Sequence, residues 1–433
     1  MIANATTRAC FHTLGCRLNQ SETQSIQERF ESEGYHIVPF GGEADLLVIN
    51  TCTVTRLAES KCRQSIRQFQ RRNPHAYVAV VGCYSQTGYK ELSQMKGIDL
   101  ILGNHDKINV IDYIGDAEKA EQPVIVRERI DKQDFTMQIV GERPFQKRAN
   151  LKIQEGCDFF CSFCIIPFAR GRARSREWDN LMAEARNLAQ RGVRELVLTG
   201  VNIGTYDSGG KGIVDIVDAL NEIDGIERVR ISSIEPTTIP ETLFDRMNEF
   251  DHTLTPFLHI PLQSGSDKIL KEMKRKYDTR EFLEFIEMAK ERVPNLMIGT
   301  DILVGYPGET EEDFEHTCQF FLDSPINFCH VFTYSERQNT PAAKSPEQIP
   351  TQERKRRSAR LRRLSAHKKH ETYAAYEGRI MNVLFEDPRE DTWPGYTDNY
   401  IRVVTSSDQN LTNQFAPARL RNTTAEFVEA DLV

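Results

Sequence analysis

The sequence lacks any apolar stretch that could cross a lipid bilayer, which takes about 20 consecutive apolar residues. Its first eight residues contain no apolar core of the kind that a secretory signal peptide carries. Together these two absences predict a cytoplasmic protein without membrane attachment. The hydrophobic fraction of 39% and the charged fraction of 27% are typical of an ordinary globular protein.

Residue sets for acid–base or nucleophilic catalysis are also lacking. Neither a Ser-His-Asp set nor a carboxylate pair is evident. His12 and His259 each lie within a strand pattern, which favours a structural role for both. The ten cysteines are the remaining source of reactive groups, and in a reducing compartment they are metal ligands or buried thiols rather than disulfides.

The C-x3-C-x2-C run of Cys157, Cys161 and Cys164 is the most informative feature of the chain. A structural zinc site would need a fourth Cys or His at a matching spacing, and none precedes the long helical pattern that follows. A disulfide is disfavoured because spacings this short strain ring closure. Three such thiolates can ligate three irons of a cubane iron–sulfur cluster, which leaves the fourth iron open to a small molecule. Zinc or a coincidental grouping is the alternative.

This run resembles the signature of the radical S-adenosylmethionine (SAM) enzymes. The resemblance implies that the open iron chelates the methionine part of SAM. It further implies that an electron from the cluster cleaves SAM to methionine and a 5′-deoxyadenosyl radical, which abstracts hydrogen from an unactivated C–H bond. No catalytic residue beyond the cluster ligands is therefore expected.

A second set of cysteines lies in the N-terminal third, where alternating strand and helix patterns predict a mostly parallel sheet covered on both faces. Cys16, Cys52 and Cys83 each follow a predicted strand. Because ligand sites form beyond the carboxyl ends of parallel strands, we expect these residues to meet in space. Gly15 and Gly82 each precede a cysteine, and glycine lets the backbone approach a bulky cluster closely. Three unrelated buried thiols are the alternative.

These segments resemble the N-terminal domain of the methylthiotransferase branch of the radical SAM enzymes. The matching stretches are TLGCRLNQSE at 13–22, NTCTVT at 50–55 and GCYSQ at 82–86. The resemblance implies that Cys16, Cys52 and Cys83 hold an auxiliary [4Fe-4S] cluster whose open iron carries the sulfur of the methylthio group. Asn19 and Asn50 are either hydrogen-bonding residues near this cluster or ordinary turn residues.

Six strand–helix units follow between Leu151 and about Arg337, which predicts an open (β/α)6 barrel with functional loops at the carboxyl ends of its strands. Polar, glycine-bearing segments follow these strands, as a small-molecule site requires. By resemblance these segments match those that contact SAM. The residues implied are Phe163, Gly200, Asn202, Ser233, Glu235, Gln263, Val304 and Gly305.

The C-terminal part combines a basic strip with a pattern of short strands. The strip runs from Arg354 to His370 and predicts either a surface for a polyanion or a solvated helix face. The roughly sixty residues after it predict a small β-barrel, which resembles a TRAM domain, an RNA-binding module of tRNA-modifying enzymes. Arg170, Arg172 and Arg174 could bind phosphates or a carboxylate, with a solvated loop as the alternative.

The sequence therefore predicts an α/β protein of three domains. They are an N-terminal domain with an open parallel sheet at 1–142, a radical SAM domain at 143–371 and a TRAM-like barrel at 372–433. The stretch from Cys157 to Ser175, with Gly15-Cys16-Arg17-Leu18-Asn19, is similar to the threonylcarbamoyladenosine tRNA methylthiotransferases. The resemblance implies that C2 of N6-threonylcarbamoyladenosine, next to the anticodon, receives a methylthio group. Relatives that act on isopentenyladenosine in tRNA, or on an aspartate of a ribosomal protein, share both cluster motifs.

The cofactors implied are two [4Fe-4S] clusters and SAM, which acts both as methyl donor and as radical source. The partners implied are a tRNA substrate and an unidentified electron donor, and a monomer without membrane contact is expected. A protein that binds RNA or senses redox state through iron–sulfur clusters, without catalysis, is the alternative of another class. Formation of 5′-deoxyadenosine from SAM distinguishes the two.

Overall fold

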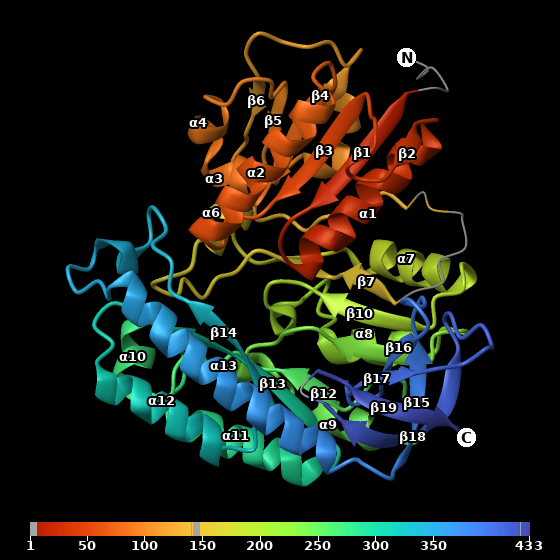
Figure 1. Ribbon diagram of the computed structural model, residues 1–433, viewed down its shortest axis with the longest axis vertical. Helices are drawn as coiled ribbons and strands as arrows, with labels where there is room; N and C mark the ends of the chain where they lie inside the picture. Colours follow the sequence, from red (N-terminus) through yellow and green to blue (C-terminus); the bar gives the residue numbers. More distant parts are fainter. Residues whose placement is uncertain (1–6, 140, 142–147, 425) are drawn as a thin grey trace.

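The computed structural model describes residues 7–139, 141, 148–424 and 426–433. Three units follow one another along the chain (Figure 1). A parallel sheet with its helices lies at the top of the view, strand–helix units lie in the middle, and a small barrel lies at the lower right. This arrangement confirms the predicted α/β fold class. In the described residues, no helix is long and apolar enough to cross a membrane.

Six parallel strands form the N-terminal sheet. They are β1 (Arg8–Thr13), β2 (His36–Val38), β3 (Leu46–Thr51), β4 (Tyr77–Gly82), β5 (Leu100–Leu102) and β6 (Val124–Val126). Their spatial order is β2-β1-β3-β4-β5-β6. The central strands β3 and β4 are buried along their whole length, as expected for a parallel sheet that is covered on both faces.

Helices cover both faces of this sheet. α1 (Arg17–Ser32) packs on one face through Phe30, and α2 (Arg56–Arg72) packs on the other through Phe69. The two faces have separate apolar cores because successive side chains of a strand point to opposite sides. The short helices of this unit are α3 (Cys83–Thr87), α4 (Tyr89–Leu92) and α5 (Ile111–Ile114).

The central unit is an open ring of parallel strands. They are β7 (Ala149–Lys152), β10 (Glu195–Thr199), β11 (Arg228–Ile231), β12 (Phe257–His259), β13 (Met297–Val304) and β14 (Phe328–Thr333). β11-β10-β7 and β12-β13-β14 form two separate ladders. Beyond β11, the Ile234 N–H donates to the His259 carbonyl at 3.0 Å and so connects the two ladders. The ring is the open barrel that the sequence predicts.

Helices pack around this ring, and a short antiparallel pair opens it. The pair is β8 (Gln154–Glu155) with β9 (Arg174–Ser175). The helices are α6 (Ile166–Arg170), α7 (Trp178–Gln190), α8 (Ile213–Asn221), α9 (Thr242–Asn248), α10 (Asp267–Glu272), α11 (Thr279–Arg292) and α12 (Glu311–Asp323). A continuous core of Leu, Ile, Val and Phe side chains lies between helices and strands.

The basic strip of the sequence forms helix α13 (Thr351–Ala374), which packs against β14 and α12. Several of its cations pair within the protein. Arg357 lies 2.6 Å from the Glu309 carboxylate, and Arg356 lies 2.5 Å from Glu311. The Lys368 ammonium group donates to main-chain carbonyl groups at the end of α12. Much of the strip therefore fixes α13 on the central unit, a role that differs both from a free polyanion-binding surface and from a solvated helix face.

A closed five-stranded barrel ends the chain and confirms the predicted small β-barrel. Its strands are β15 (Ile380–Phe385), β16 (Trp393–Thr397), β17 (Arg402–Thr405), β18 (Phe415–Thr423) and β19 (Val428–Leu432). Arg228 and Arg230 of β11 donate hydrogen bonds to main-chain carbonyl groups of this barrel. Phe257 joins the apolar core of the barrel. The barrel is thus fixed against the open ring.

Candidate functional site

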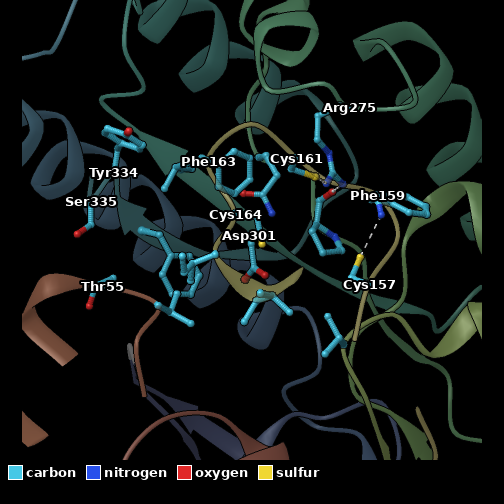
Figure 2. A pocket seen from close by; sticks show the side chains of 18 of the residues that line it. Thr55, Cys157, Phe159, Cys161, Phe163, Cys164, Arg275, Asp301, Tyr334 and Ser335 are labelled. Carbon is cyan, nitrogen blue, oxygen red and sulfur yellow. Dashed lines mark hydrogen bonds between the residues drawn. The ribbon is translucent and has the colours of Figure 1, made fainter. Parts of the chain in front are cut away.

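The loop after β8 carries the three cysteines of the C-x3-C-x2-C run. Cys157, Cys161 and Cys164 line one cavity of about 290 Å³, here called the cysteine cavity (Figure 2). Burial raises the pKa of Cys157 to about 11 and that of Cys164 to about 12. Gly156 starts the loop with φ +72°, and a Cβ atom there would clash with the Arg172 carbonyl. The tight start of the loop therefore requires glycine.

Neither cysteine triplet has the spacing of a preformed zinc site. Among the described residues, only His105, Asp106 and Glu128 place three candidate ligand atoms all within 4.8 Å of one another. A tetrahedral zinc ion with Zn–S bonds of about 2.3 Å needs sulfur atoms about 3.8 Å apart. In each cysteine triplet at least one pair of sulfur atoms is wider than this. The wider spacing fits a larger group such as a cubane cluster.

The residues that the sequence assigns to SAM contact occupy different positions around this cavity. Four of them line the cysteine cavity together with the cysteines: Phe163, Ser233, Glu235 and Gln263. Gly200 lines a neighbouring cavity, and the next residue, Val201, lines the cysteine cavity. Their SAM contacts stay a prediction, but the structure gathers these segments around one space as the strand order requires.

Val304 and Gly305 lie outside the lining of the cysteine cavity. Val304 is fully buried in the core of the central unit. Gly305 has φ +75°, packs against the side chain of Arg354 and donates its N–H to the Glu309 carboxylate at 2.7 Å. Asp301 and Leu303 are the residues of β13 that line the cavity, because alternate side chains of a strand point to the same side.

The side-chain amide of Asn202 has a hydrogen-bond donor that no other described residue satisfies. Its amide oxygen accepts a hydrogen bond from the Thr238 hydroxyl at 3.1 Å. Its buried Nδ2 has no hydrogen-bond partner among the described residues. Buried amide groups are normally satisfied, so the free donor indicates that a polar ligand belongs beside it. The hydroxyl, amino and carboxylate groups of SAM fit this requirement. Asn202 itself is not part of the lining of the cysteine cavity or of the inner cavity, although Val201 and Gly200, the two residues before it, line them.

Arg275 is a residue of this site that the sequence does not reveal. It pairs with the Glu235 carboxylate, and its Nη1 lies 3.3 Å from Cys161 Sγ (Figure 2). Its Nη2 also donates to the Tyr277 hydroxyl at 2.7 Å. Burial raises the pKa of Glu235, and the positive charge of Arg275 offsets only part of this rise. Arg275 lies in the charged run Lys274–Lys276, which looks like solvated surface, so no local signal identifies it.

The second cysteine set lies beyond the carboxyl ends of three neighbouring strands. Cys16 follows β1, Cys52 follows β3 and Cys83 follows β4, and these strands are adjacent in the sheet. A Cβ atom on Gly15 would lie only 2.9 Å from the Cys52 Cβ, so the first loop passes directly over the second. Burial, followed by the nearby thiols of Cys83 and Cys16, raises the pKa of Cys52 to about 12. The predicted meeting of the three residues is what the structure shows.

Asparagine side chains tie these three loops together. Asn19 Nδ2 donates to the main-chain carbonyl groups of Leu14 and Thr51, which precede the first two cysteines. The Asn50 amide group donates to the Asn19 carbonyl at 3.1 Å. Asn104, which the sequence gives no reason to select, donates to Cys83 Sγ at 3.5 Å. These bonds hold the loops in place before any cluster binds.

The sequence predicts a cluster at Cys16, Cys52 and Cys83, and replacing Gly82 by alanine is expected to prevent that cluster from binding. Gly82 has φ +99°, and a Cβ atom there would clash with the Asn50 side chain and lie 2.9 Å from the Thr51 carbonyl. The Cys83 loop must then shift, so we expect about half of the iron and acid-labile sulfide to be lost. Gly34→Ala is the matched control, because Gly34 also has positive φ (+90°) but open space around it. Equal iron contents in the two variants would contradict this expectation.

Five buried charged residues join the two cysteine sites, and we call them the charged seam. They are Glu22, Lys107, Lys152, Glu155 and Arg170, and each side chain is at most 3% exposed. Glu22 accepts from Lys107 at 2.5 Å, from Lys152 at 2.8 Å and from Arg170 at 2.9 Å. Burial would raise the pKa of Glu22, but the cations of Arg170, Lys107 and Lys152 hold it well below its usual value. The seam thus fixes the N-terminal sheet on the central unit.

The three arginines that follow Cys164 have different environments. Arg170 belongs to the charged seam and also donates to Asn19 Oδ1 at 2.5 Å, so it cannot contact RNA phosphates. Arg174 is 8% exposed and pairs with Glu155 at 3.1 Å. Arg172 is 54% exposed, although it pairs with Asp158. Of the three, only Arg172 is accessible to an external partner.

A second cavity of about 230 Å³, the inner cavity, lies between the two cysteine sites. Cys16 lines it, and it shares Ser233 and Asp301 with the cysteine cavity. From the other side, Val54 and Thr55 in the loop after Cys52 line the cysteine cavity (Figure 2). The cysteine cavity and the inner cavity are therefore neighbours, and each cysteine set contributes to the lining of one of them.

His259 of β12 is buried, but it lies in the wall of the inner cavity rather than in the core. Its Nε2 lies 2.8 Å from Asp301 Oδ1, and both residues line the inner cavity together with His330. The two imidazole rings stack with centroids 5.3 Å apart. His12, by contrast, stacks on Phe40 at 4.0 Å, and burial lowers its pKa, as expected of a structural histidine.

Comparison with known proteins agrees with this geometry. The family model of the radical SAM superfamily matches residues 151–321. A model described as "Uncharacterized protein family UPF0004" matches residues 8–103, which contain the second cysteine set. A solved radical S-adenosylmethionine methyltransferase, TsrM from Kitasatospora setae, aligns with a TM-score of 0.55 at 15% identity, over 78% of this chain and 77% of that one. This last likeness concerns the fold alone.

Two curated relatives align over nearly the whole chain. The threonylcarbamoyladenosine tRNA methylthiotransferase MtaB of Bacillus subtilis is 37% identical, over 95% of this chain and 93% of its own length. The tRNA-2-methylthio-N(6)-dimethylallyladenosine synthase of Alkaliphilus oremlandii is 33% identical, over 94% of this chain and 89% of its own length. With two cysteine triplets on the two expected units and relatives of this identity, the chain belongs to the radical SAM methylthiotransferase family.

Proposed function

We propose that this protein transfers a methylthio group to C2 of N6-threonylcarbamoyladenosine next to the anticodon of tRNA. The observation that carries the proposal is that the three radical-site cysteines line the cysteine cavity and Cys16 of the second triplet lines the adjacent inner cavity. Relatives named for threonylcarbamoyladenosine reach 37% identity, which supports this base as the substrate.

Membership of the family implies a [4Fe-4S] cluster and SAM. In our proposal Cys157, Cys161 and Cys164 hold that cluster, and Cys16, Cys52 and Cys83 hold a second, auxiliary one. When bound, the clusters and SAM supply the radical and the sulfur of the reaction. The second cluster rests on the resemblance and on the convergence of its three ligands beyond adjacent strands.

The protein's own groups bind and orient the reactants. Phe163, Ser233, Glu235 and Gln263 are proposed to hold SAM, since they surround the cavity of the three radical-site cysteines. Arg275 places its positive charge between Glu235 and Cys161, where it neutralises part of the negative charge that a ligated thiolate carries. The largely apolar lining excludes water, which protects a reactive radical from side reactions.

The proposed partner is tRNA, which would approach where the N-terminal unit, the ring and the barrel meet. A cavity of about 590 Å³, the outer cavity, opens there. Its lining includes three arginines and two tyrosines: Arg17, Arg148, Arg389, Tyr396 and Tyr400. Arginine suits phosphate groups, and tyrosine rings are surfaces on which bases stack.

A second candidate substrate is dimethylallyladenosine, because relatives named for that base reach 33% identity. The two substrates can be separated in tRNA from a strain that lacks the gene. We expect 2-methylthio-N6-threonylcarbamoyladenosine to disappear, and its precursor without the methylthio group to accumulate, in nucleoside mass spectrometry. Loss of the methylthio derivative of dimethylallyladenosine instead would establish the second candidate. An unchanged nucleoside profile would count against both.

A further inference from the structure

Three cavities lie in series between the radical-site cysteines and the surface. The cysteine cavity shares Ser233 and Asp301 with the inner cavity. The inner cavity in turn shares Arg17 and Tyr400 with the outer cavity. Arg17 and Tyr400 therefore lie where the outer cavity adjoins the inner one.

Arg17 occupies this junction directly beside a proposed cluster ligand. It follows Cys16 in the sequence and is the first residue of α1. Its Nη2 donates to the Tyr400 hydroxyl at 2.5 Å, and its guanidinium carbon lies 5.8 Å from the centre of the Tyr400 ring. Both contacts leave most of its five N–H donors available.

Arg17 differs from Arg148 and Arg230, the other two arginines beside Tyr400, in lacking an acidic partner among the described residues. Arg148 pairs with Glu386 at 2.7 Å, and Arg230 pairs with Glu195 at 3.0 Å. Within the part of the chain that the structure describes, Arg17 forms no ion pair with a carboxylate. A half-buried arginine without an acidic partner favours an anionic group of the ligand in that place.

Tyr400 is held firmly in the position that contacts Arg17. It has φ +74°, which is uncommon for a residue other than glycine. Its ring stacks on Tyr396 at 4.8 Å and packs against Phe257 at 4.5 Å. Burial would raise the pKa of Tyr400, but the guanidinium groups of Arg17, Arg148 and Arg230 lower it. The barrel thus holds the Tyr400 hydroxyl in a fixed position between the inner and the outer cavity.

The proposed substrate has one anionic group on its base, the carboxylate of the threonyl moiety on N6. In adenine only the ring atom N1 separates C2 from the carbon that carries N6. When C2 faces the cluster at Cys16, the N6 substituent therefore leaves the ring on a neighbouring edge. Arg17 follows Cys16 directly and lines both the inner and the outer cavity, on the side of Cys16 toward the surface.

We propose that Arg17 binds the carboxylate of the threonylcarbamoyl group and thereby selects this base. The inference rests on the proposed function. Arginine matches a carboxylate with two parallel N–H donors, which gives geometric selectivity as well as affinity. A backbone phosphate of the RNA is the other anion that Arg17 could bind. A contact with the threonyl carboxylate affects only RNAs that carry this group, whereas a contact with a phosphate affects every RNA alike.

The test compares two synthetic anticodon stem–loop RNAs, one with N6-threonylcarbamoyladenosine and one in which its carboxylate is replaced by a primary amide. Binding to the anaerobically reconstituted protein is titrated by fluorescence anisotropy at one salt concentration, without reductant. We expect the wild type to prefer the carboxylate RNA by about tenfold, since a charged hydrogen bond is lost with the amide. Arg17→Gln should reduce this ratio to near one while leaving the affinity for the amide RNA unchanged.

Arg389→Gln is the matched control, because Arg389 lines the outer cavity but not the inner one. Because Arg389 is a proposed phosphate contact, Arg389→Gln should lower the affinity for both RNAs by the same factor and so leave their ratio unchanged, and iron analysis should show full cluster content in both variants. An equal loss of affinity for both RNAs in Arg17→Gln would indicate a phosphate contact and overturn the inference. A ratio that persists in Arg17→Gln would overturn it as well.

The same RNAs separate this inference from the proposed function. If the wild type with SAM and reductant makes no methylthio product from the carboxylate RNA, the proposed function itself fails. If it makes the product and Arg17→Gln keeps the preference for the carboxylate, only the role of Arg17 is lost.

Discussion

Cys16→Ala is expected to abolish methylthio transfer while 5′-deoxyadenosine still forms from SAM. Cys16 lies with Cys52 and Cys83 at the sheet edge, whereas the radical-site cysteines lie on a separate loop of the central unit. Loss of a ligand should lower product formation by roughly a hundredfold or more, since changes even to residues behind metal ligands cost about 10–100-fold. Chromatography of the SAM products and mass spectrometry of the RNA measure both activities in one reaction.

Cys161→Ala should instead abolish both activities, because Cys161 belongs to the radical-site triplet. Cys10→Ala provides the control: Cys10 lies in β1, six positions before Cys16, but its side chain is buried in the core of the sheet. It should keep both activities. Methylthio product from the Cys16→Ala variant at the wild-type rate would show that no auxiliary cluster takes part.

Glu22→Gln is expected to cost about 3–5 kcal/mol of unfolding free energy, the range measured when one partner of a buried ion pair is removed. Glu22 is the anion at the centre of the charged seam, in contact with Lys107, Lys152 and Arg170. Its loss leaves three buried cations with Glu155 as the nearest remaining anion. Urea denaturation followed by fluorescence measures the change, and limited proteolysis shows whether the N-terminal unit separates from the central one.

Arg280→Gln is the comparison for this effect. Arg280 pairs with Glu284 on the exposed face of α11 at 3.3 Å, with side chains 71% and 62% exposed. Such a surface pair contributes at most about 1 kcal/mol to the unfolding free energy, so the midpoint of the urea denaturation should barely change. A similar small shift for Glu22→Gln would mean that the seam does not hold the units together.

The seam also has a defined pH dependence. Burial opposes ionisation of Glu155, but Lys152 and Arg170 lower its pKa to about 2. A carboxyl group whose pKa is depressed in the folded state stabilises fully above its unfolded value of about 4.3. This contribution should therefore be constant from neutral pH down to about pH 5 and decline as the pH falls toward 2.

The positions of the cysteines could be predicted from the sequence because they depend on local pattern and topology. Parallel strands bring their carboxyl ends to one edge, so residues after β1, β3 and β4 had to meet. The fold class followed from the same alternation of strands and helices. On β13 the sequence indicated the backbone around Val304 and Gly305, which stays a prediction, while the alternation of side chains along the strand directs Leu303 into the cavity.

The basic residues show where the sequence misleads. Arg170 follows the radical-site cysteines and looks like an RNA contact, yet it is buried against Glu22, more than a hundred positions earlier in the chain. The strip on α13 looks like a polyanion-binding face, yet Arg357 is satisfied by Glu309. A charge run in a sequence reveals the cations but not the distant acids that neutralise them.

The sequence by itself determined the two cysteine triplets, the order of strands and helices, and hence the family. Only the tertiary structure decided which charged residues are paired, that Arg275 contacts Cys161, and that Tyr400 meets Arg17 between the inner and outer cavities. The physical reason is the separation along the chain between the residues that determine each feature. Periodicity and loop position follow from the backbone geometry of a few neighbouring residues, whereas an ion pair or a cavity depends on segments that the chain brings together from hundreds of positions apart.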